Sequence, residues 1–337
     1  MIIVMKPEAS EETVQRLLHK IEAKGLKPLH MPGAERVVLG ALGDERVLAE
    51  LGFDAEPSVE SVKPILSPYK LVSRELHPHD SRISIGDAVI GGGRFAMIAG
   101  PCAVENEEQV MASARAAKAA GARVLRGGAY KPRTSPYSFQ GHGPEGLKLL
   151  KAAGEEVGLP IVTEVVDARD LDIITDAADA IQVGTRNMQN FELLKAVGGA
   201  GVPVILKRGT AAKVDDLLMA AEYIMASGND EVILCERGIR TFETATRNTL
   251  DLAAVPLLKQ KSHLPVVVDP SHGTGKRELV APMALAAAAA GADGVMVETH
   301  YDPPSALSDG PQSLYPEQIE ALGHQLSRLL HALGREL

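Results

Sequence analysis

Eight short apolar segments of this 337-residue chain each end in a polar or ionisable residue, and one group of these residues is cationic. Arg binds carboxylate and phosphate groups through paired hydrogen bonds, and Lys supplies a compact positive charge. So many cations would repel one another without a counter-charge, so they predict a small phosphorylated, carboxylated metabolite as the ligand. Some are expected to pair instead with Glu164, Glu236 or Asp269. The cationic group is Arg126, Lys131, Arg133, Arg186, Lys207 and Arg237.

A second group joins a thiol, an imidazole and a carboxylate. Cys102, His272 and Glu298 follow the first, seventh and eighth segments, and Asp309 is a further candidate. This mixture of ligand types is typical of a transition-metal site, and the sulfur argues against Mg²⁺ alone. It suits Mn²⁺, Fe²⁺, Co²⁺ or Zn²⁺. A metal beside a polyanion pocket indicates Lewis-acid activation of a second substrate's carbonyl. The other cysteine, Cys235, is predicted to be core packing.

The segments that carry these residues are rich in β-branched side chains, and amphipathic stretches separate them. Strands that are apolar on both faces and alternate with helices predict a parallel sheet. Eight such units in about 240 residues predict a TIM (β/α)8 barrel, an α/β fold whose active sites lie at the C-terminal ends of the strands. We therefore predict an enzyme. A doubly wound open sheet is the alternative, and the lack of a GxGxxG motif in the first unit disfavours it. The segments read FAMIAGPC, ARVLRGG, PIVTEVV, AIQVGT, PVILKRG, EVILCERG, PVVVDPSH and GVMVETH.

Residues 1–70 predict a separate, small α+β domain. Ser10 is a suitable N-cap for its first helix, which Gly25 would end. The order βαββαβ is that of a ferredoxin-like fold. Residues 71–81 are predicted to be a linker in which His77 and His79 are solvated, and residues 82–337 a barrel that begins with a hairpin. The strands and helices of the small domain are expected at 1–6, 10–25, 27–31, 35–41, 44–52 and 59–65.

The composition narrows the class of protein. With 35 Lys+Arg against 44 Asp+Glu the chain is acidic, which argues against nucleic acid as a partner. The N-terminus does not have the pattern of a signal peptide. The alanine-rich run at 284–292 is too short to span a bilayer, and two distant cysteines make no disulfide framework. We expect a cytoplasmic enzyme that has no membrane partner.

Seven blocks of the sequence resemble the 3-deoxy-D-arabino-heptulosonate 7-phosphate (DAHP) synthase family, over roughly residues 82–337. Residues 1–70 resemble the ferredoxin-like regulatory domain of some members of its type I beta branch. The family condenses phosphoenolpyruvate with erythrose 4-phosphate and water, giving DAHP and phosphate in the first step of the shikimate pathway to the aromatic amino acids. The blocks are IAGPC (98–102), RGGAYKPRTSPYSFQG (126–141), RNMQNFELL (186–194), LKRG (206–209), CERGIRTFE (235–243), VDPSHGTGKR (268–277) and SDGPQSL (308–314).

The resemblance implies roles for individual residues. The phosphoenolpyruvate carboxylate is assigned to Arg126, Lys131 and Lys207, and its phosphate to Arg186 and Arg237 with Lys207 nearby. Arg133 and Thr134 are assigned to erythrose 4-phosphate. The metal is assigned to Cys102, His272, Glu298 and Asp309, with Mn²⁺ as the first expectation and Fe²⁺, Co²⁺, Zn²⁺ or Cd²⁺ as alternatives. The candidate catalytic residues are Lys131, His272 and Glu164, and the choice between Glu164 and His272 for the protons of water stays open.

The resemblance also implies a homotetramer that tyrosine, phenylalanine or both inhibit through the N-terminal domain. The alternative is that this domain only aids assembly. Two residues depart from the family pattern: Thr185 stands where Ala is usual, and His142 where an apolar residue is usual. Thr185 is expected to tighten the phosphate pocket, and His142 to lie at the edge of its loop.

Two other functions, a related synthase and a non-catalytic sensor, are alternatives to DAHP synthase. The related 3-deoxy-D-manno-octulosonate 8-phosphate synthase uses arabinose 5-phosphate and shares the barrel and the CERG block. It typically has KANRSS where this chain has KPRTSP, so the motif favours DAHP synthase. A non-catalytic amino-acid sensor with a degenerate barrel is the second rival, and the complete set of cations and metal ligands disfavours it.

Overall fold

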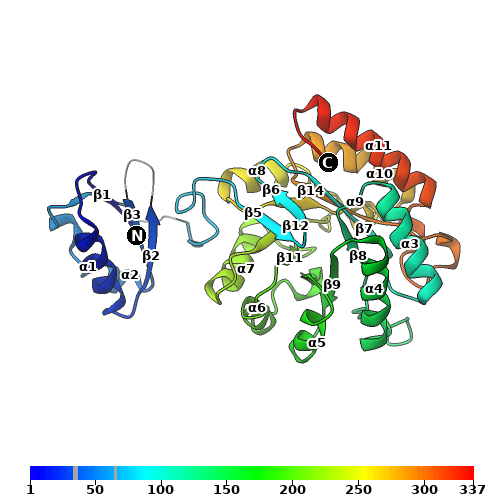
Figure 1. The fold of residues 1–337 in the computed structure, drawn as a ribbon, viewed down its shortest axis with the longest axis horizontal. Coiled ribbons are helices and arrows are strands. Elements are labelled where there is room, and N and C mark those ends of the chain that lie inside the picture. Colours follow the sequence, from blue (N-terminus) through cyan, green and yellow to red (C-terminus); the bar gives the residue numbers. More distant parts are fainter. Residues whose placement is uncertain (33–36, 64–66) are drawn as a thin grey trace. The chain divides into compact units, whose positions relative to one another are not determined.

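The computed structural model describes residues 1–32, 37–63 and 67–337, and within them the chain forms two compact units, Met1–Pro78 and His79–Leu337 (Figure 1). The second unit is an eight-stranded parallel barrel, and the first is a small α+β domain. The predicted fold class is therefore confirmed for both parts.

The first unit has the predicted ferredoxin-like order of elements. Its antiparallel sheet has the strand order β2-β3-β1-β4. The Ser10 hydroxyl accepts the backbone N–H of Thr13 and so caps the first helix, as predicted. The predicted strand residues 35–36 and 64–65 lie outside the described residues. The elements are β1 (Ile2–Met5), α1 (Glu11–Glu22), β2 (Lys27–Pro32), β3 (Val37–Leu42), α2 (Glu45–Ala49) and β4 (Val59–Lys63).

The core of this unit follows from side-chain periodicity. Alternate residues of β1, Ile3 and Met5, are fully buried, while Val14, Leu17 and Ile21 form one stripe of α1. These positions repeat every two residues on the strand and every three or four on the helix, so each element buries one face. The segment 71–81, predicted as a linker, contains the buried side chains of Leu71, Val72 and Leu76 and the exposed ones of His77 and His79.

In the second unit, parallel pairing closes the barrel between the first and last strands. Residues Gly294–Glu298 pair in register with Ala96–Gly100. This closure excludes the open doubly wound sheet. Every residue of the eight strands is buried, which is why their sequences lack an apolar–polar alternation. The strands are β7 (Ala96–Gly100), β8 (Val124–Arg126), β9 (Ile161–Val165), β10 (Ala180–Val183), β11 (Val204–Lys207), β12 (Val232–Glu236), β13 (Val266–Val268) and β14 (Gly294–Glu298).

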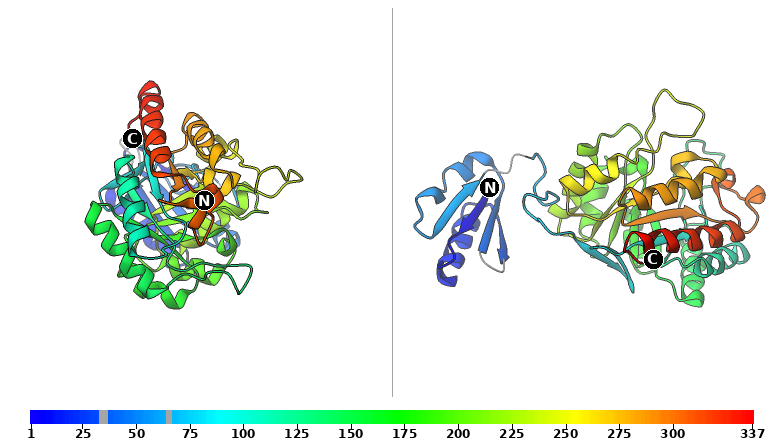
Figure 2. Two further views of the ribbon diagram at one scale, coloured as in Figure 1. Left: turned by 90° about the vertical axis from the view of Figure 1, so that its right-hand side faces the viewer. Right: turned by 90° about the horizontal axis from the view of Figure 1, so that it is seen from above.

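Helices surround the barrel, and the longer ones bury an apolar stripe (Figures 1 and 2). In the longest of them the stripe is Ile319, Leu322, Leu326 and Leu330. Within the described ranges, no helix is long and apolar enough to cross a bilayer. The helices are α3 (Glu107–Ala119), α4 (Pro144–Val157), α5 (Leu171–Thr175), α6 (Phe191–Gly198), α7 (Val214–Ala226), α8 (Ala254–Lys261), α9 (Pro270–Thr274), α10 (Arg277–Ala289) and α11 (Pro316–Ala332).

A hairpin of β5 (Arg82–Ile85) and β6 (Ala88–Gly91) fills one end of the barrel. Its apolar side chains, Ile83 and Ile90 among them, form one core cluster with buried residues from all eight strands. Cys235 belongs to this cluster, so its predicted place in the core is confirmed. Because the hairpin closes the N-terminal end, the C-terminal ends of the strands are left to form the mouth.

Candidate active site at the barrel mouth

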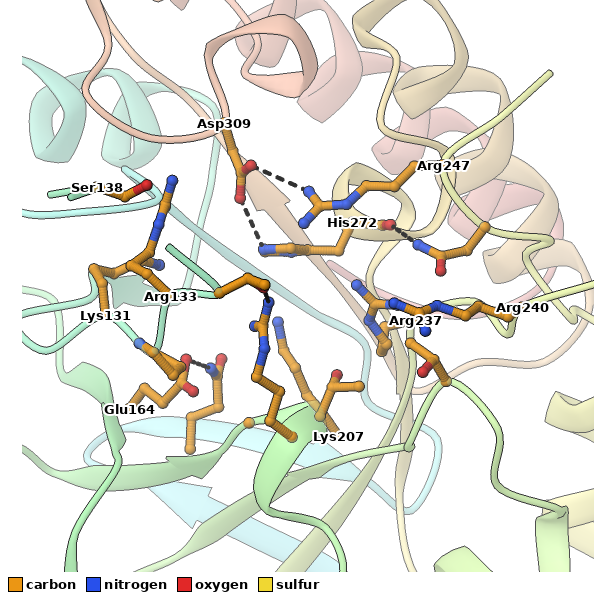
Figure 3. Close-up of a pocket in the computed structure, with 18 of the residues that line it drawn as sticks. Lys131, Arg133, Ser138, Glu164, Lys207, Arg237, Arg240, Arg247, His272 and Asp309 are labelled. Atoms are coloured by element: carbon orange, nitrogen blue, oxygen red, sulfur yellow. Dashed lines mark hydrogen bonds and ion pairs between the residues drawn. The ribbon is translucent and has the colours of Figure 1, made fainter. Parts of the chain in front are cut away.

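A cavity of about 470 Å³ opens at the C-terminal ends of the barrel strands. Figure 3 shows Lys131 and Arg133 on one side of it, Arg237 and Arg240 on the other, and Asp309 in contact with both His272 and Arg247. Only Cys102 and Glu298 of the predicted site residues do not line it, and both are buried beside lining residues. The predicted residues that line it are Arg126, Lys131, Arg133, Thr134, Glu164, Arg186, Lys207, Arg237, His272 and Asp309.

The four predicted metal ligands come together. Donor atoms of Cys102, His272, Glu298 and Asp309 all lie within 4.8 Å of one another. Asp309 Oδ2 is 3.3 Å from the Cys102 sulfur and 3.6 Å from His272 Nε2, which is 3.3 Å from Glu298 Oε1. The pairing of β14 with β7 brings Glu298 beside the loop of Cys102. One sulfur, one nitrogen and two carboxylates suit a divalent transition ion.

The orientation of the imidazole is set by a buried carboxylate. Asp269 caps α9 through the backbone N–H of His272 and also lies 2.7 Å from His272 Nδ1, which leaves Nε2 facing the other ligands. The Lys207 ammonium donates to the same carboxylate at 2.6 Å. Burial alone would raise the pKa of Asp269, but His272 and Lys207 hold it well below its usual range. Asp269 thus joins the predicted metal cluster to the predicted phosphoenolpyruvate cations.

Two of the four candidate metal ligands, Cys102 and Asp309, have shifted pKa values. Burial, with the charge of Glu298 adding to it, raises the pKa of the Cys102 thiol to about 12. Although burial acts in the opposite direction, His272 and Arg247 lower the pKa of Asp309 to about 2. At neutral pH the thiol is therefore protonated without a bound cation, and the aspartate is ionised.

The cations of the mouth differ in whether a carboxylate neutralises them. Arg126 Nη1 donates to Glu298 Oε1 at 2.9 Å, and Lys207 is paired with Asp269. Arg237 is only 5% exposed, yet no carboxylate of the described residues lies within ion-pair distance of it, and its Nε has no hydrogen-bond partner there. Burial lowers the pKa of Arg237, and the charge of Asp269 offsets only part of this shift. A buried guanidinium without a counter-ion indicates a site for an anionic ligand.

Directly after β11, a second buried arginine has the carboxylate partners that Arg237 lacks. Arg208 donates to Glu236 at 2.8 Å and to Asp251 at 2.9 Å. The other oxygen of Glu236 accepts the backbone N–H of Gly238 at 2.6 Å. This network holds the chain on both sides of Arg237 and so fixes where its guanidinium enters the cavity.

Glu164 is a carboxylate of the mouth without a cationic partner among the described residues. It is 9% exposed and accepts a hydrogen bond from Gln182 Nε2 at 3.0 Å through Oε2. A Cβ at Gly184 would overlap its other oxygen, so only glycine allows the carboxylate to lie there. Oε1 is left to accept a proton or a hydrogen bond.

The predicted aldose phosphate residues lie at the outer part of the mouth. Arg133 Nη1 donates to the Ser308 hydroxyl at 2.6 Å, and Arg186 Nη2 to the Thr134 hydroxyl at 3.3 Å. Of the two departures from the family pattern, Thr185 lines the cavity. His142 is exposed and its Nε2 lies 2.8 Å from the Glu105 carbonyl.

Several lining residues were not predicted from the sequence. Arg240 and Arg247 both lie in the loop between β12 and α8, which projects from the barrel (Figure 2). Arg247 Nη1 contacts Asp309 Oδ1 at 3.1 Å. The signal that could have found them is their position after the same strand as Arg237, since any cation of such a loop can reach the mouth. The other additions include Thr210, Asn248 and Gln182.

Comparisons with known proteins agree over the whole chain. The DAHP synthetase I family model matches residues 73–333, and the DAHP synthase ferredoxin-like domain model matches residues 1–67. A phospho-2-dehydro-3-deoxyheptonate aldolase of Thermotoga maritima is 50% identical over 334 residues, 99% of both proteins. The crystal structure of a T. maritima DAHP synthase gives a TM-score of 0.79 at 50% identity, covering 99% of this chain and 98% of that one.

Two further comparisons bear on the domains and on the rival function. A truncated form of the T. maritima synthase covers 80% of this chain and 98% of its own, with a TM-score of 0.75 and 49% identity. A 2-dehydro-3-deoxyphosphooctonate aldolase of Syntrophobacter fumaroxidans is 35% identical over 255 residues, 70% of this chain and 88% of that protein.

Proposed function

Because this chain belongs to the DAHP synthetase I family, we propose that its barrel mouth condenses phosphoenolpyruvate with erythrose 4-phosphate and water in a metal-dependent reaction. The chain is an enzyme of the shikimate pathway, a 3-deoxy-7-phosphoheptulonate synthase. One observation supports the proposed metal-dependent condensation: a four-ligand cluster lies at the same cavity as the buried guanidinium of Arg237, which has no ion-pair partner among the described residues. The cluster suits a metal cation, and the guanidinium suits an anionic substrate.

For phosphoenolpyruvate we assign the carboxylate to Arg126, Lys131 and Lys207, and the phosphate to Arg186 and Arg237 with Lys207 nearby. The contacts of Arg126 with Glu298 and of Lys131 with the Cys102 carbonyl, at 2.9 and 3.0 Å, support a fixed position for both cations beside the metal cluster. Preorganised cations are worth more in such a buried site than in water, because little reorganisation is needed during the reaction.

In the reaction, the π electron pair of the phosphoenolpyruvate double bond forms a bond from its methylene carbon to the aldehyde carbon of erythrose 4-phosphate. The π pair of the aldehyde C=O moves to its oxygen, which takes up a proton. Water adds to the resulting cationic carbon, and the phosphohemiketal collapses with loss of phosphate. A divalent ion, with Mn²⁺ expected first and Fe²⁺, Co²⁺, Zn²⁺ or Cd²⁺ as alternatives, would supply Lewis acidity toward the aldehyde oxygen. Its ligands would be Cys102, His272, Glu298 and Asp309.

We assign the proton of the attacking water to Glu164 rather than to His272. Both nitrogens of His272 are engaged in this arrangement, Nδ1 with Asp269 and Nε2 toward the metal ligands. The Oε1 atom of Glu164 has no partner among the described residues and lies at the cavity wall. Lys131 Nζ is 3.2 Å from the Cys102 sulfur. We propose Lys131 as a catalytic residue whose charge would act on the phosphoenolpyruvate carboxylate beside the metal.

The test of this function is phosphate release from phosphoenolpyruvate with each aldose phosphate, with and without EDTA. Turnover with erythrose 4-phosphate that EDTA abolishes is the expected result. Turnover with arabinose 5-phosphate alone would overturn the substrate assignment. If neither aldose phosphate is turned over with any of the divalent metal ions added, the proposal that the barrel mouth is catalytic would be overturned.

Arg133→Ala is expected to raise the KM for erythrose 4-phosphate far more than the KM for phosphoenolpyruvate. Loss of one charge-assisted contact to the aldose phosphate costs about 2–4 kcal/mol. Steady-state kinetics with each substrate varied in turn measure the effect. The exposed Arg94, which pairs with Glu336, provides a matched control, Arg94→Ala, that is expected to change neither KM. An effect of Arg133→Ala on phosphoenolpyruvate alone would contradict the assignment.

We further propose that residues 1–70, followed by a linker at 71–81, regulate a cytoplasmic homotetramer by binding tyrosine, phenylalanine or both. The predicted site residues all lie in the barrel unit, so the small domain is free for a role other than chemistry. A ligand that prefers an inhibited arrangement tenfold supplies about 1.4 kcal/mol of coupling. Sedimentation velocity measures the oligomeric state, and a monomer at assay concentration would contradict the tetramer.

Deletion of residues 1–70 is expected to leave an active enzyme that tyrosine and phenylalanine no longer inhibit. The solved truncated form of the T. maritima relative supports a barrel that folds without this domain. Initial rates of the full and shortened chains, with each amino acid titrated, measure the difference. Inhibition of the shortened chain as strong as that of the full chain would show that the domain does not bind the inhibitor.

A further inference from the structure

The two carboxylates of the candidate metal cluster each direct one oxygen to the other ligands and one oxygen away from them. For Glu298 the inner atom is Oε1, 3.3 Å from His272 Nε2. For Asp309 it is Oδ2, 3.3 Å from the Cys102 sulfur. The outer oxygen of each carboxylate accepts a hydrogen bond from a different side chain. The side chain that donates to Glu298 belongs to a residue outside the predicted site.

That donor is Gln312, in a 3-10 turn at Gly310–Gln312. Its side chain is 2% exposed, and Nε2 donates to Glu298 Oε2 at 2.7 Å. Arg247 Nη1 donates to the amide oxygen of Gln312 at 2.9 Å and to Asp309 Oδ1 at 3.1 Å. An arginine can only donate, so its contact fixes which end of the amide faces Glu298. Gln312 and Arg247 therefore link the outer oxygens of both carboxylates.

We propose that Gln312 is a positioning residue that holds Glu298 ready to bind the metal ion; this rests on the metal site of the proposed function. The terminal torsion of a glutamate is broad, so its carboxylate turns easily unless its outer oxygen is held. The inner oxygen has a competing partner in Arg126 Nη1 at 2.9 Å. Without the amide of Gln312, the carboxylate is free to turn toward Arg126 and away from the cluster.

Gln312 is also the better residue to test than Arg247. Removing a positive charge next to a metal site strengthens cation binding by itself, so an arginine variant would combine two opposed effects. Gln312→Met keeps the length and the net charge and removes only the amide. Gln182→Met is a matched control because Gln182 is 4% exposed and also donates to a buried glutamate, Glu164, at 3.0 Å. That glutamate is not among the candidate metal ligands.

Titration of Mn²⁺ into the full-length, metal-free protein, followed by calorimetry, is the experiment. Partners of metal ligands typically contribute 10- to 100-fold to metal affinity, so Gln312→Met is expected to raise the Kd for Mn²⁺ by about that factor. Gln182→Met is expected to leave it unchanged. Turnover of Gln312→Met should recover as Mn²⁺ approaches saturation, which a general loss of structure would not allow.

A Kd for Gln312→Met within twofold of that for Gln182→Met would overturn the proposal. If Gln312→Met unfolds, Gln312→Asn provides the second variant, since it keeps the amide but is one methylene too short to reach Glu298; an unchanged Kd there would overturn the proposal equally. The existence of the metal site is tested separately with Cys102→Ala. If that variant binds Mn²⁺ as tightly as the unaltered chain, the metal site itself is wrong, whatever Gln312 does.

Discussion

Replacement of Cys102 by alanine is expected to abolish turnover and Mn²⁺ binding together. The thiol is one of four donors within 4.8 Å of one another, so its removal leaves only three side-chain ligands for the ion. Lewis-acid activation of a carbonyl is worth several kcal/mol, and each 1.36 kcal/mol is a factor of ten in rate. We therefore expect kcat to fall by roughly 1,000-fold or more. EDTA treatment of the unaltered enzyme should give the same loss, which added Mn²⁺ reverses.

The second cysteine provides the control for this experiment. Cys235 lies in the barrel core among apolar side chains, so Cys235→Ala removes a sulfur without removing a donor of the cluster. We expect it to lower stability slightly and to keep Mn²⁺ binding. Full turnover of Cys102→Ala in the presence of EDTA would contradict the metal-dependent mechanism.

The sequence could predict the barrel because its strands are buried on both faces. Such strands read as continuous apolar runs, and each run ends where the chain reaches the mouth, so the residue that ends the strand is placed by the fold alone. Arg126, the last residue of β8, and Glu298, the last residue of β14, are examples. The small domain was predictable for a related reason: the cap at Ser10 and the periodicity of its helix are local signals.

Long loops have no periodic pattern of apolar residues from which the direction of a side chain could be predicted. Arg240 and Arg247 lie between β12 and α8, where neither strand alternation nor helical spacing fixes the direction of a side chain. Their approach to the cavity depends on contacts made far along the chain, such as that of Arg247 with Asp309, 62 residues away. The ion-pair partners of the buried charged residues could not be assigned from the sequence either. Pattern alone does not tell that Lys207 is neutralised by Asp269 while Arg237 is left without a carboxylate.

Because Arg237, unlike Lys207, has no carboxylate partner in the described part of the chain, we expect Arg237→Met to cause a large loss of kcat/KM for phosphoenolpyruvate. Arg237 is buried, its Nε has no partner among the described residues, and no carboxylate there lies within ion-pair distance of it. If it binds the phosphate of phosphoenolpyruvate, its removal costs about 2–4 kcal/mol, which is roughly a 30- to 1,000-fold loss of kcat/KM for that substrate. Steady-state kinetics with phosphoenolpyruvate varied measure the loss. An unchanged kcat/KM would contradict the assignment.

The same variant is expected to be more stable than the unaltered protein. The lowered pKa of Arg237, caused mainly by burial, means that its charge costs free energy in the folded chain until a ligand neutralises it. Its guanidinium is charged at every pH below that pKa, so the cost is present throughout the neutral range. Without substrates, Arg237→Met should therefore raise the free energy of unfolding by about 0.5–2 kcal/mol. Denaturant unfolding of the ligand-free protein measures this change.

Arg208 supplies a control of opposite sign. It is a buried arginine of the neighbouring strand end, 4% exposed, but it is paired with Glu236 and Asp251. Arg208→Met breaks these pairs and leaves Glu236 without its cation, which should cost about 3–5 kcal/mol of stability. The two variants make the same chemical change in similarly buried places, so burial alone cannot explain opposite results. If Arg237→Met instead destabilises the chain as Arg208→Met does, the guanidinium of Arg237 is structural, and the anion site must lie elsewhere in the mouth.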